Sequence, residues 1–185
     1  MSIVDKIIGI FEKHGHQEYL GEAVTMAEHM LQSAFFANQA GEPKRVIVAA
    51  LLHDIGHFTS ELGSFSMEDT KDRYHEDSGA VFLEKYFPST VVDCVKHHVA
   101  AKRYLCATDQ DYFSALSEAS VHSLNLQGGP MSSDEVMAFE REPNLAAIVR
   151  VRKYDDRGKD PGIKVPDIYS YRKIIEEVSY EQQAL

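Results

Sequence analysis

The chain has 185 residues, of which 44% are apolar and 26% are charged, as expected for a globular protein with one packed core. Its formal net charge of -10 and the lack of a dense lysine and arginine cluster exclude nucleic acid as an expected partner. No apolar run approaches the roughly 18 residues of a membrane span, no signal-peptide pattern opens the chain, and only two cysteines are present. We therefore expect a cytoplasmic protein with no membrane partner and a single domain over residues 1–185.

The N-terminal part predicts two helices. Apolar residues recur with helical spacing over residues 3–11, and the pattern fades soon afterwards. Thr25 followed by Glu28 has the capping-box form, so a second helix is expected from there towards Gly41. This helix places His29 on its inward face.

A buried helix with a histidine-aspartate pair at its end is expected next. Pro43 can occupy a first helical turn, and the apolar pattern continues until Gly56. The adjacent residues His53 and Asp54 therefore lie in the last turn of this helix. The polar stretch from Thr59 to Asp72 has no clear period and is long enough to be a lid or a substrate loop.

Two helices are predicted in the middle of the chain. His75 opens the first, which ends before Pro88. Ser89 is positioned to cap the second. His98 and Lys102 are four residues apart on the second helix and share one face.

The last third predicts further helices and one long polar connection, and no convincing strand pattern appears anywhere in the chain. The predictions, in order, are a helix over 113–126 stopped by Gly128, Gly129 and Pro130, a capping box at Ser132 and Glu135, a helix capped by Asn144 that delivers Arg152 and Asp155, a loop over 153–166, and a final helix capped by Asp167. The fold class expected is all-α.

Metal chemistry is the function that the histidines and aspartates suggest. His53 and Asp54 offer an imidazole and a carboxylate side by side, and His29 and Asp155 complete a set of two histidines and two aspartates. Such mixed nitrogen and oxygen donors suit iron, manganese and similar divalent metals. Spacing alone leaves an alternative open for each histidine, namely a hydrogen-bonded core or surface residue.

The sequence from Leu51 to His57 resembles the HD-domain superfamily, whose fold is a helical bundle. In that superfamily the fourth ligand is a distant aspartate, and the Arg152 to Asp155 segment resembles its position. The resemblance favours Asp155 over its neighbour Asp156. It implies an HD domain that binds metal.

Two further histidines, His75 and His98, go beyond the ligand set that one metal needs and imply a second metal. Asp54 would bridge the two metals, with His29, His53 and Asp155 on the first and His75 and His98 on the second. The second metal, with fewer protein ligands, keeps positions open for substrate. His97 competes with His98 for this role, and we choose His98 because Lys102 lies four residues further on.

A closer resemblance extends over almost the whole chain. The chain resembles the HD-domain mixed-valent diiron oxygenases, and the segments that carry the resemblance are 19–25, 101–106, 123–131 and 151–155. These enzymes cleave the carbon–phosphorus bond of hydroxyphosphonates. The resemblance implies two iron ions (Fe2+/Fe3+), O2 and a small hydroxyphosphonate as partners. It is strongest to members that convert (R)-1-hydroxy-2-(trimethylamino)ethylphosphonate into glycine betaine and phosphate.

The same resemblance implies roles for individual side chains around the metals. Tyr19 would cap the open position of the second iron before substrate arrives, and Glu22 would face the cationic end of the substrate. The candidates that bind the phosphonate are Lys102, Ser120, Arg152 and His57. His57 also has a possible acid-base role. The alternative for Lys102 and Arg152 is an ordinary surface ion pair.

Two rival functions are weighed beside this one. The first is the oxygenase that acts on 2-amino-1-hydroxyethylphosphonate and gives glycine. The second is a metal-dependent HD phosphohydrolase, which needs the metal ligands but not Tyr19 or Glu22. A catalytically silent signalling module is disfavoured, because buried histidines and carboxylates are costly without partners.

Overall fold

The structure is a computed structural model that describes residues 1–19, 21–59 and 74–180. These residues form helices and turns, with one isolated antiparallel bridge between Glu18 and Thr25, so the predicted all-α fold is confirmed. In chain order the helices are α1 (Ile3–His14), α2 (Met26–Gln39), α3 (Lys44–Leu52), α4 (Gly56–Thr59), α5 (His75–Leu83), α6 (Ser89–Thr108), α7 (Gln110–Ser114), α8 (Glu118–Leu126), α9 (Ser133–Phe139), α10 (Leu145–Arg157), the 3-10 helix η1 (Ile168–Tyr171) and α11 (Arg172–Val178).

Helix α3 is the centre of the bundle. Its residues from Val46 to Leu52 are all buried, because α2, α6, α10 and α11 pack around it. A helix buried on every side needs an apolar surface all round, and this stretch contains only valine, isoleucine, alanine and leucine. The arrangement holds the end of α3 deep inside the molecule.

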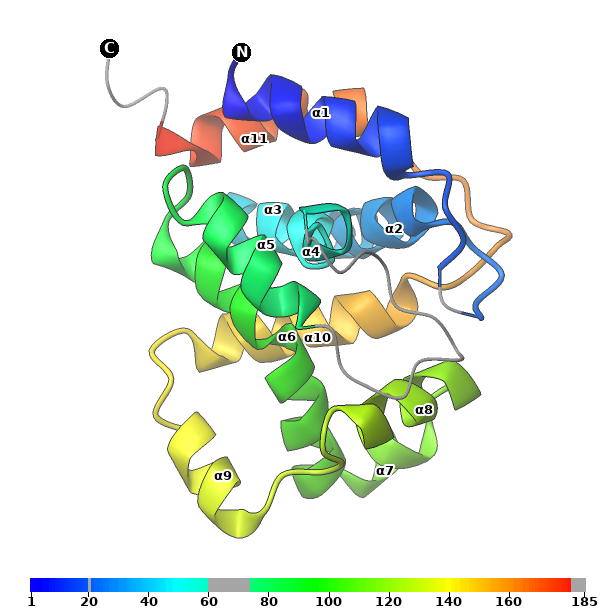
Figure 1. Ribbon diagram of the computed structural model, residues 1–185, viewed down its shortest axis with the longest axis vertical. Helices are drawn as coiled ribbons and strands as arrows, with labels where there is room; N and C mark the ends of the chain where they lie inside the picture. Colours follow the sequence, from blue (N-terminus) through cyan, green and yellow to red (C-terminus); the bar gives the residue numbers. More distant parts are fainter. Residues whose placement is uncertain (20, 60–73, 181–185) are drawn as a thin grey trace.

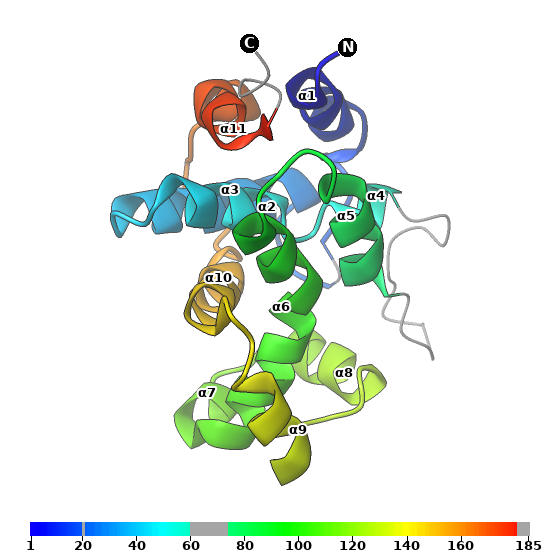
Figure 2. The same ribbon diagram turned by 90° about the vertical axis from the view of Figure 1, so that its left-hand side faces the viewer.

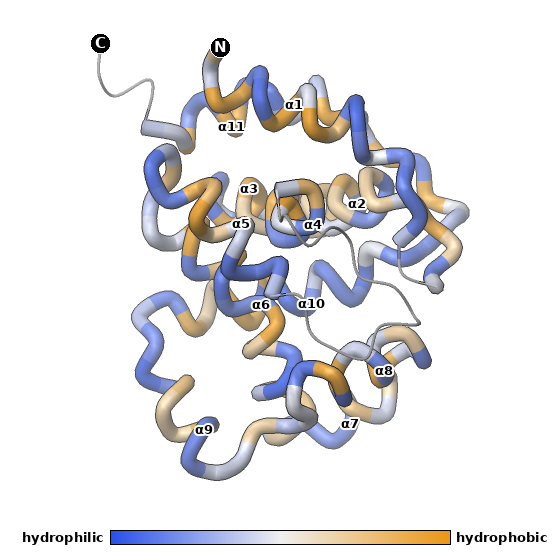
Figure 3. Tube along the Cα trace, in the orientation of Figure 1, coloured by the Kyte–Doolittle hydropathy of each residue, from blue (hydrophilic) through white to orange (hydrophobic). Residues whose placement is uncertain are grey.

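The helices lie in layers about α3. In Figure 1, α1 and α11 lie above α2 and α3, and α6 and α10 lie below them. The view turned by 90° shows the same order, with α7, α8 and α9 gathered at the far end of α6 (Figure 2). Hydrophobic positions of α1 and α11 face the helices beneath them (Figure 3). The core is therefore continuous from the upper layer to α6 and α10.

The predicted capping boxes are present. The Thr25 hydroxyl accepts a hydrogen bond from the Glu28 N–H at 3.2 Å, and the Thr25 N–H donates to Glu28 Oε2 at 2.7 Å. Ser132 and Glu135 form the same reciprocal pair at the start of α9. These local hydrogen bonds satisfy N–H groups that the first turn of a helix leaves free.

The end of the central helix differs from the prediction. Helix α3 ends at Leu52, and His53 and Asp54 lie in the turn that follows it, before α4 begins at Gly56. The prediction that Gly56 ends the helix is wrong, because this glycine opens α4 where α4 packs on α5. A Cβ at Gly56 would lie 1.8 Å from the carbonyl oxygen of His75, so no other residue fits.

The predicted helix over 113–126 is also interrupted. Helix α7 ends at Ser114, and α8 begins at Glu118 after Ser117, whose hydroxyl accepts a hydrogen bond from the Ser120 N–H. A side-chain cap of this kind starts a new helix inside an otherwise continuous pattern.

Two predicted helix ends are shifted, and one predicted cap residue makes no cap bond. Pro88 rather than Ser89 stands at the N-cap of α6. Asn144 stands at the N-cap of α10 but makes no cap bond, because its side-chain amide donates to Asp93 at 2.7 Å. The predicted loop over 153–166 begins only after α10 ends at Arg157. Asp167 does cap the final helical stretch, through the Ser170 N–H.

Two further predictions concern the loop after α4 and membrane-spanning helices. The proposed lid or substrate loop from Thr59 to Asp72 lies outside the described residues, except for Thr59 at the end of α4. None of the described helices is long and apolar enough to cross a bilayer.

The close approach of α4 to α5 gives a first testable prediction. Gly56→Ala should destabilise the protein by about 3 kcal/mol or more, because the added methyl group collides with backbone rather than with a movable side chain. Thermal unfolding measures the effect. Gly9→Ala is the control: no atom lies within 4 Å of the added Cβ, and its position inside α1 should make alanine neutral or stabilising. Equal stability of the two variants would contradict the prediction.

Candidate metal centre

Six buried side chains from five parts of the chain converge inside the bundle. None of them is more than 7% exposed. They are His29 from α2, His53 and Asp54 from the turn after α3, His75 from the start of α5, His98 from α6 and Asp155 from α10. The helices that carry them are those that pack on or next to α3.

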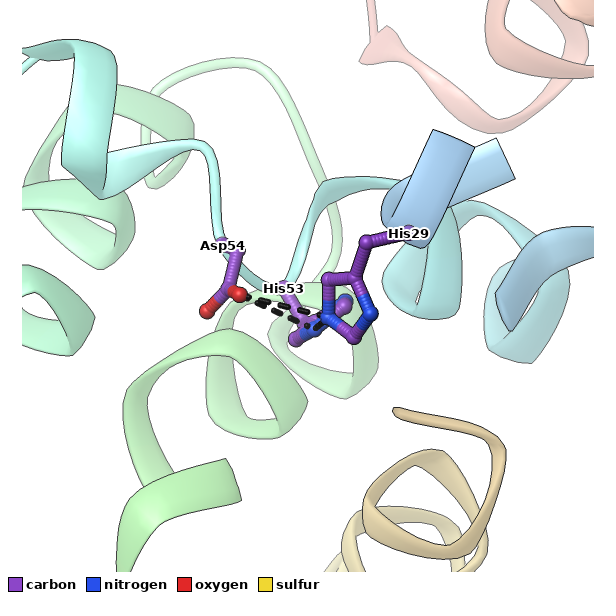
Figure 4. A group of neighbouring side chains, drawn as sticks. All are labelled: His29, His53 and Asp54. Atoms are coloured by element: carbon purple, nitrogen blue, oxygen red, sulfur yellow. Dashed lines mark hydrogen bonds and ion pairs between the residues drawn. The ribbon is translucent and has the colours of Figure 1, made fainter. Parts of the chain in front are cut away.

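The first group of donors surrounds the end of α3. His29 Nε2 lies 2.9 Å from His53 Nε2 and 3.3 Å from Asp54 Oδ2. Asp155 closes the group, with Oδ1 at 3.4 Å from His29 Nε2 and Oδ2 at 3.6 Å from His53 Nε2. Figure 4 shows His29, His53 and Asp54 pointing toward one another from α2 and from the turn.

The second group shares Asp54 with the first. His75 Nε2 and His98 Nε2 lie 3.0 Å apart, and each is 3.2 Å from Asp54 Oδ1. Asp54 therefore presents one carboxylate oxygen to each group. A carboxylate placed in this way is suited to bridge two cations.

Hydrogen bonds behind the rings settle which nitrogen carries the proton. In three of the histidines, His29, His53 and His98, Nδ1 lies 2.7–2.9 Å from a backbone carbonyl oxygen, that of Gly158, Ala50 and Val95 respectively. A carbonyl oxygen only accepts, so each Nδ1 carries hydrogen and each ring turns Nε2 into the cluster, where a neutral imidazole offers a lone pair. Two lone pairs 2.9 Å apart repel each other, so a proton or a metal cation between the two nitrogens stabilises this arrangement.

The carboxylates add negative charge at the same place. Burial lowers the pKa of His29, but hydrogen bonds to Asp155 and Asp54 outweigh burial and raise it to about 9. The centre thus attracts positive charge even at a buried imidazole. Asp155 Oδ1 is buried, and it lies 3.4 Å from His29 Nε2. Converging imidazole nitrogens, a shared carboxylate and a second buried carboxylate together fit bound divalent metal ions.

The structure places the two members of each neighbouring pair, His97 and His98 and then Asp155 and Asp156, in different surroundings. His98 lies inside the cluster, whereas the side chain of His97 is 23% exposed and lies 3.9 Å from Glu142. Asp155 lies inside the cluster, whereas Asp156 turns away and binds Arg152. The structure places the two predicted residues together with the other candidates and leaves their neighbours outside.

A small cavity opens on the donor groups. Its wall includes Asp54, His75 and His98 of the second group and Asp155 of the first, but neither His29 nor His53. A small ligand in the cavity would therefore meet both histidines of the second group and neither histidine of the first. The other polar residues that line it are Tyr19, His57, Lys102, Ser123, Gln127 and Arg152.

The two positively charged side chains of the cavity wall, those of Lys102 and Arg152, have different partners. Lys102 is 4% exposed and donates to Ser123 Oγ at 2.7 Å, and burial, followed by repulsion from Arg152, lowers its pKa to about 7. Arg152 is held by two carboxylates, with Nη1 at 2.6 Å from Asp155 Oδ2 and a two-pronged contact to Asp156. Only Lys102 therefore stands without a carboxylate partner among these contacts.

Two aromatic contacts support the metal ligands. The ring of Tyr19 stacks on His29 with centroids 3.9 Å apart, and the ring of His57 stacks on His75 at 4.0 Å. His57 Nε2 lies 3.8 Å from Asp54 Oδ1. Burial, and next the neighbouring His75, hold the pKa of His57 well below its usual range, so this ring is neutral.

The remaining predicted residues lie behind Tyr19 rather than in the cavity wall. Glu22 Oε1 accepts from Ser117 Oγ at 2.7 Å and lies 3.3 Å from the ammonium of Lys159. Ser120 accepts from the same ammonium at 2.8 Å. Lys159 was not predicted as a site residue, because it falls in the stretch interpreted as a plain loop. The one signal in the sequence is its position directly after Gly158 at the end of α10.

Comparisons with known proteins identify the family. The model of the HD domain matches residues 26–136. The chain is 58% identical over 177 residues to a glycine-betaine-forming 1-hydroxy-2-(trimethylamino)ethylphosphonate dioxygenase of Leisingera caerulea, an alignment that covers 96% of this chain and 90% of the relative. It is 41% identical to a hydroxymethylphosphonate dioxygenase of Gimesia maris, with 94% of this chain and 86% of the relative covered.

A third relative is an uncharacterized protein of Acanthamoeba polyphaga mimivirus, 35% identical with 94% of this chain and 80% of the relative covered. The family model covers more than half of the chain, and the relatives align over nearly all of it. The chain belongs to the HD-domain family, as its motifs predicted.

Proposed function

We propose that this chain is a diiron oxygenase that cleaves the carbon–phosphorus bond of (R)-1-hydroxy-2-(trimethylamino)ethylphosphonate with O2, giving glycine betaine and phosphate. The observation that carries the proposal is the pair of donor groups that share Asp54, with a cavity over the second group. The relative from Leisingera caerulea, with the same named activity, supports it. One O2 balances the reaction, since the alcohol carbon becomes a carboxylate and the phosphonate leaves as phosphate.

The proposed ligands divide between two iron ions. His29, His53 and Asp155 would hold the first, His75 and His98 would hold the second, and Asp54 would be shared by both. Imidazole and carboxylate donors suit iron in both the Fe2+ and Fe3+ states. When bound, the iron ions supply the activation of O2 and the oxidation of the substrate carbon.

The anionic end of the substrate is proposed to bind at the cationic side of the cavity. Lys102 supplies a buried ammonium, Arg152 supplies the guanidinium N–H groups that its carboxylate partners leave free, and Ser120 lies one turn before the cavity residue Ser123 on α8. His57, neutral and stacked on His75, is proposed to donate or accept a hydrogen bond at the reacting end.

The cationic end of the substrate is proposed to face Glu22. A trimethylammonium group has no N–H to donate, so it is recognised through charge and through aromatic faces. Tyr19 lines the cavity beside Glu22 in the chain, and we propose that its side chain covers the open position of the second iron until substrate enters. The buried walls then keep water from the reacting carbon.

Oxygen dependence tests the proposed reaction. Iron-loaded protein with the trimethylated substrate should consume O2 and release phosphate in about a one-to-one ratio, and it should release no phosphate without O2. An oxygen electrode and a phosphate assay measure both quantities. Phosphate release that continues at the same rate under anaerobic conditions, or from nucleotides, would establish the hydrolase instead. Parallel assays with 2-amino-1-hydroxyethylphosphonate decide which of the two substrates is preferred.

Metal content tests the ligand assignment. His98→Ala should lower bound iron from about two ions per chain to about one, because the second group loses one of its two histidines. His97→Ala is the matched control and should keep about two, because His97 lies outside the cluster. Elemental analysis of folded protein, checked by circular dichroism, makes the measurement. Loss of iron from the His97 variant alone would reverse the assignment.

The buried Lys102 gives a prediction about stability and pH. Its pKa falls from 10.5 to about 7 on folding, so the unfolded chain binds this proton more tightly and the contribution of Lys102 to stability rises with pH between these values. Lys102→Met removes this term. The stability of the wild type relative to the variant should therefore increase by at least about 1 kcal/mol between about pH 6 and pH 10, as measured by denaturant unfolding.

The exposed Lys153 on α10 supplies the control for this measurement. Lys153→Met should show no such change relative to the wild type. A stability difference for Lys102→Met that stays constant across the pH range would contradict the prediction.

A further inference from the structure

A largely buried ion pair joins Lys159 and Glu22 close to the cavity residue Tyr19. The ammonium of Lys159 donates to Ser120 Oγ at 2.8 Å, lies 3.3 Å from Glu22 Oε1 and stands 5.9 Å from the ring centre of Tyr19. The two side chains of the pair are only 14% and 15% exposed. Lys159 therefore contacts Glu22 and Ser120, two of the residues assigned to the proposed substrate site.

The backbone on both sides of Lys159 is anchored to α2. The carbonyl of Gly158 accepts from His29 Nδ1 at 2.9 Å. The Asp160 N–H donates to Gln32 Oε1 at 3.1 Å, and Gln32 Nε2 donates to the Asp160 carbonyl at 2.8 Å. These bonds hold the Cα of Lys159 at a fixed place relative to the metal ligand His29.

Two of the residues near Lys159, Tyr19 and Glu22, lie on a short turn, the Tyr19/Glu22 turn, which is closed by the hydrogen bond from the Glu22 N–H to the Tyr19 carbonyl at 2.7 Å. Gly21, with a φ of 73°, provides the left-handed conformation within it. The side-chain contacts recorded for Glu22 are those to Lys159 and Ser117. Glu22 therefore joins the turn to Lys159 and to Ser117, in addition to the stacking of Tyr19 on His29 and the hydrogen bond from the Tyr19 N–H to the Val24 carbonyl.

We propose that Lys159 is a positioning residue that holds the Tyr19/Glu22 turn against the metal centre through its ion pair with Glu22, and that the cationic group of the substrate replaces Lys159 at Glu22. The replacement of Lys159 by the substrate rests on the proposed function. In this proposal Lys159 is the internal cation that pairs with Glu22 until a cationic substrate arrives, and it therefore helps to determine selectivity among phosphonates.

Electrostatics gives the direction of the effect. Lys159 and a substrate cation compete for one carboxylate, so removing the ammonium should favour substrates that carry a cation. Removing the same positive charge weakens the attraction for every phosphonate alike, with or without a cation. The ratio of the KM values for a substrate with a cationic group and a substrate without one therefore isolates the competition at Glu22.

Hydrogen exchange tests the positioning role without any turnover. In metal-loaded protein without substrate, Lys159→Met should speed exchange of the Tyr19 and Glu22 amides by about tenfold, because methionine keeps the length of the side chain but loses the ion pair. Lys159→Arg should restore slow exchange. Lys164→Met, an exposed lysine of the same loop, is the control and should change nothing. Unchanged exchange in Lys159→Met would overturn the positioning role, whatever reaction the protein catalyses.

Steady-state kinetics tests the competition. For each variant, KM is measured with (R)-1-hydroxy-2-(trimethylamino)ethylphosphonate and with hydroxymethylphosphonate, which has no cation. Lys159→Met should raise the preference for the cationic substrate at least about threefold, and should leave the ratio unchanged in a Glu22→Gln background, where the competition no longer exists.

A general structural defect has a different signature. It would lower kcat for both substrates and leave the KM ratio near the wild-type value. An unchanged or reduced ratio in Lys159→Met would overturn the competition. If neither phosphonate is turned over by the wild type, the proposed function fails, and the exchange measurement still decides whether Lys159 positions the turn.

Discussion

The structure depends on the need of six buried side chains for cations at their common centre. The Nε2 atoms of His29 and His53 lie 2.9 Å apart, and those of His75 and His98 converge in the same way on the other oxygen of Asp54. Lone pairs and carboxylates brought together in a buried region repel one another unless cations lie between them. Arg152 and a protonated His29 supply part of this positive charge, and bound metal ions would supply the rest.

Much of the fold was predictable because the signals that define it are local. The capping box at Thr25 and Glu28 and the all-apolar surface of α3 can be recognised within a few residues of sequence, and both are present. The errors arose where tertiary contacts decide. Gly56 resembles a helix end in sequence, yet it opens a helix because α5 approaches it too closely for a side chain. A hydroxyl cap at Ser117 likewise divides a pattern that is periodic on both sides.

The candidate site shows the same division between local and long-range information. His53 and Asp54 are adjacent, so their pairing can be read from the sequence, and the family resemblance extends the set to distant residues. Their supporting contacts could not be read, because they join residues far apart in the chain. The bond between His29 and the carbonyl of Gly158 spans 129 positions, and the contact of Lys159 with Glu22 is equally remote. No local sequence pattern predicts such partners.

The depth of the two donor groups has a consequence for metal exchange. Among the described residues, His75 and His98 line the cavity together with Asp54 and Asp155, whereas His29 and His53 do not. An ion held by the second group would border the cavity through both of its histidines, whereas an ion held by the first group would meet the cavity through carboxylates alone. The two positions, although built from similar residues and sharing one carboxylate, would therefore differ in how readily they exchange their metal.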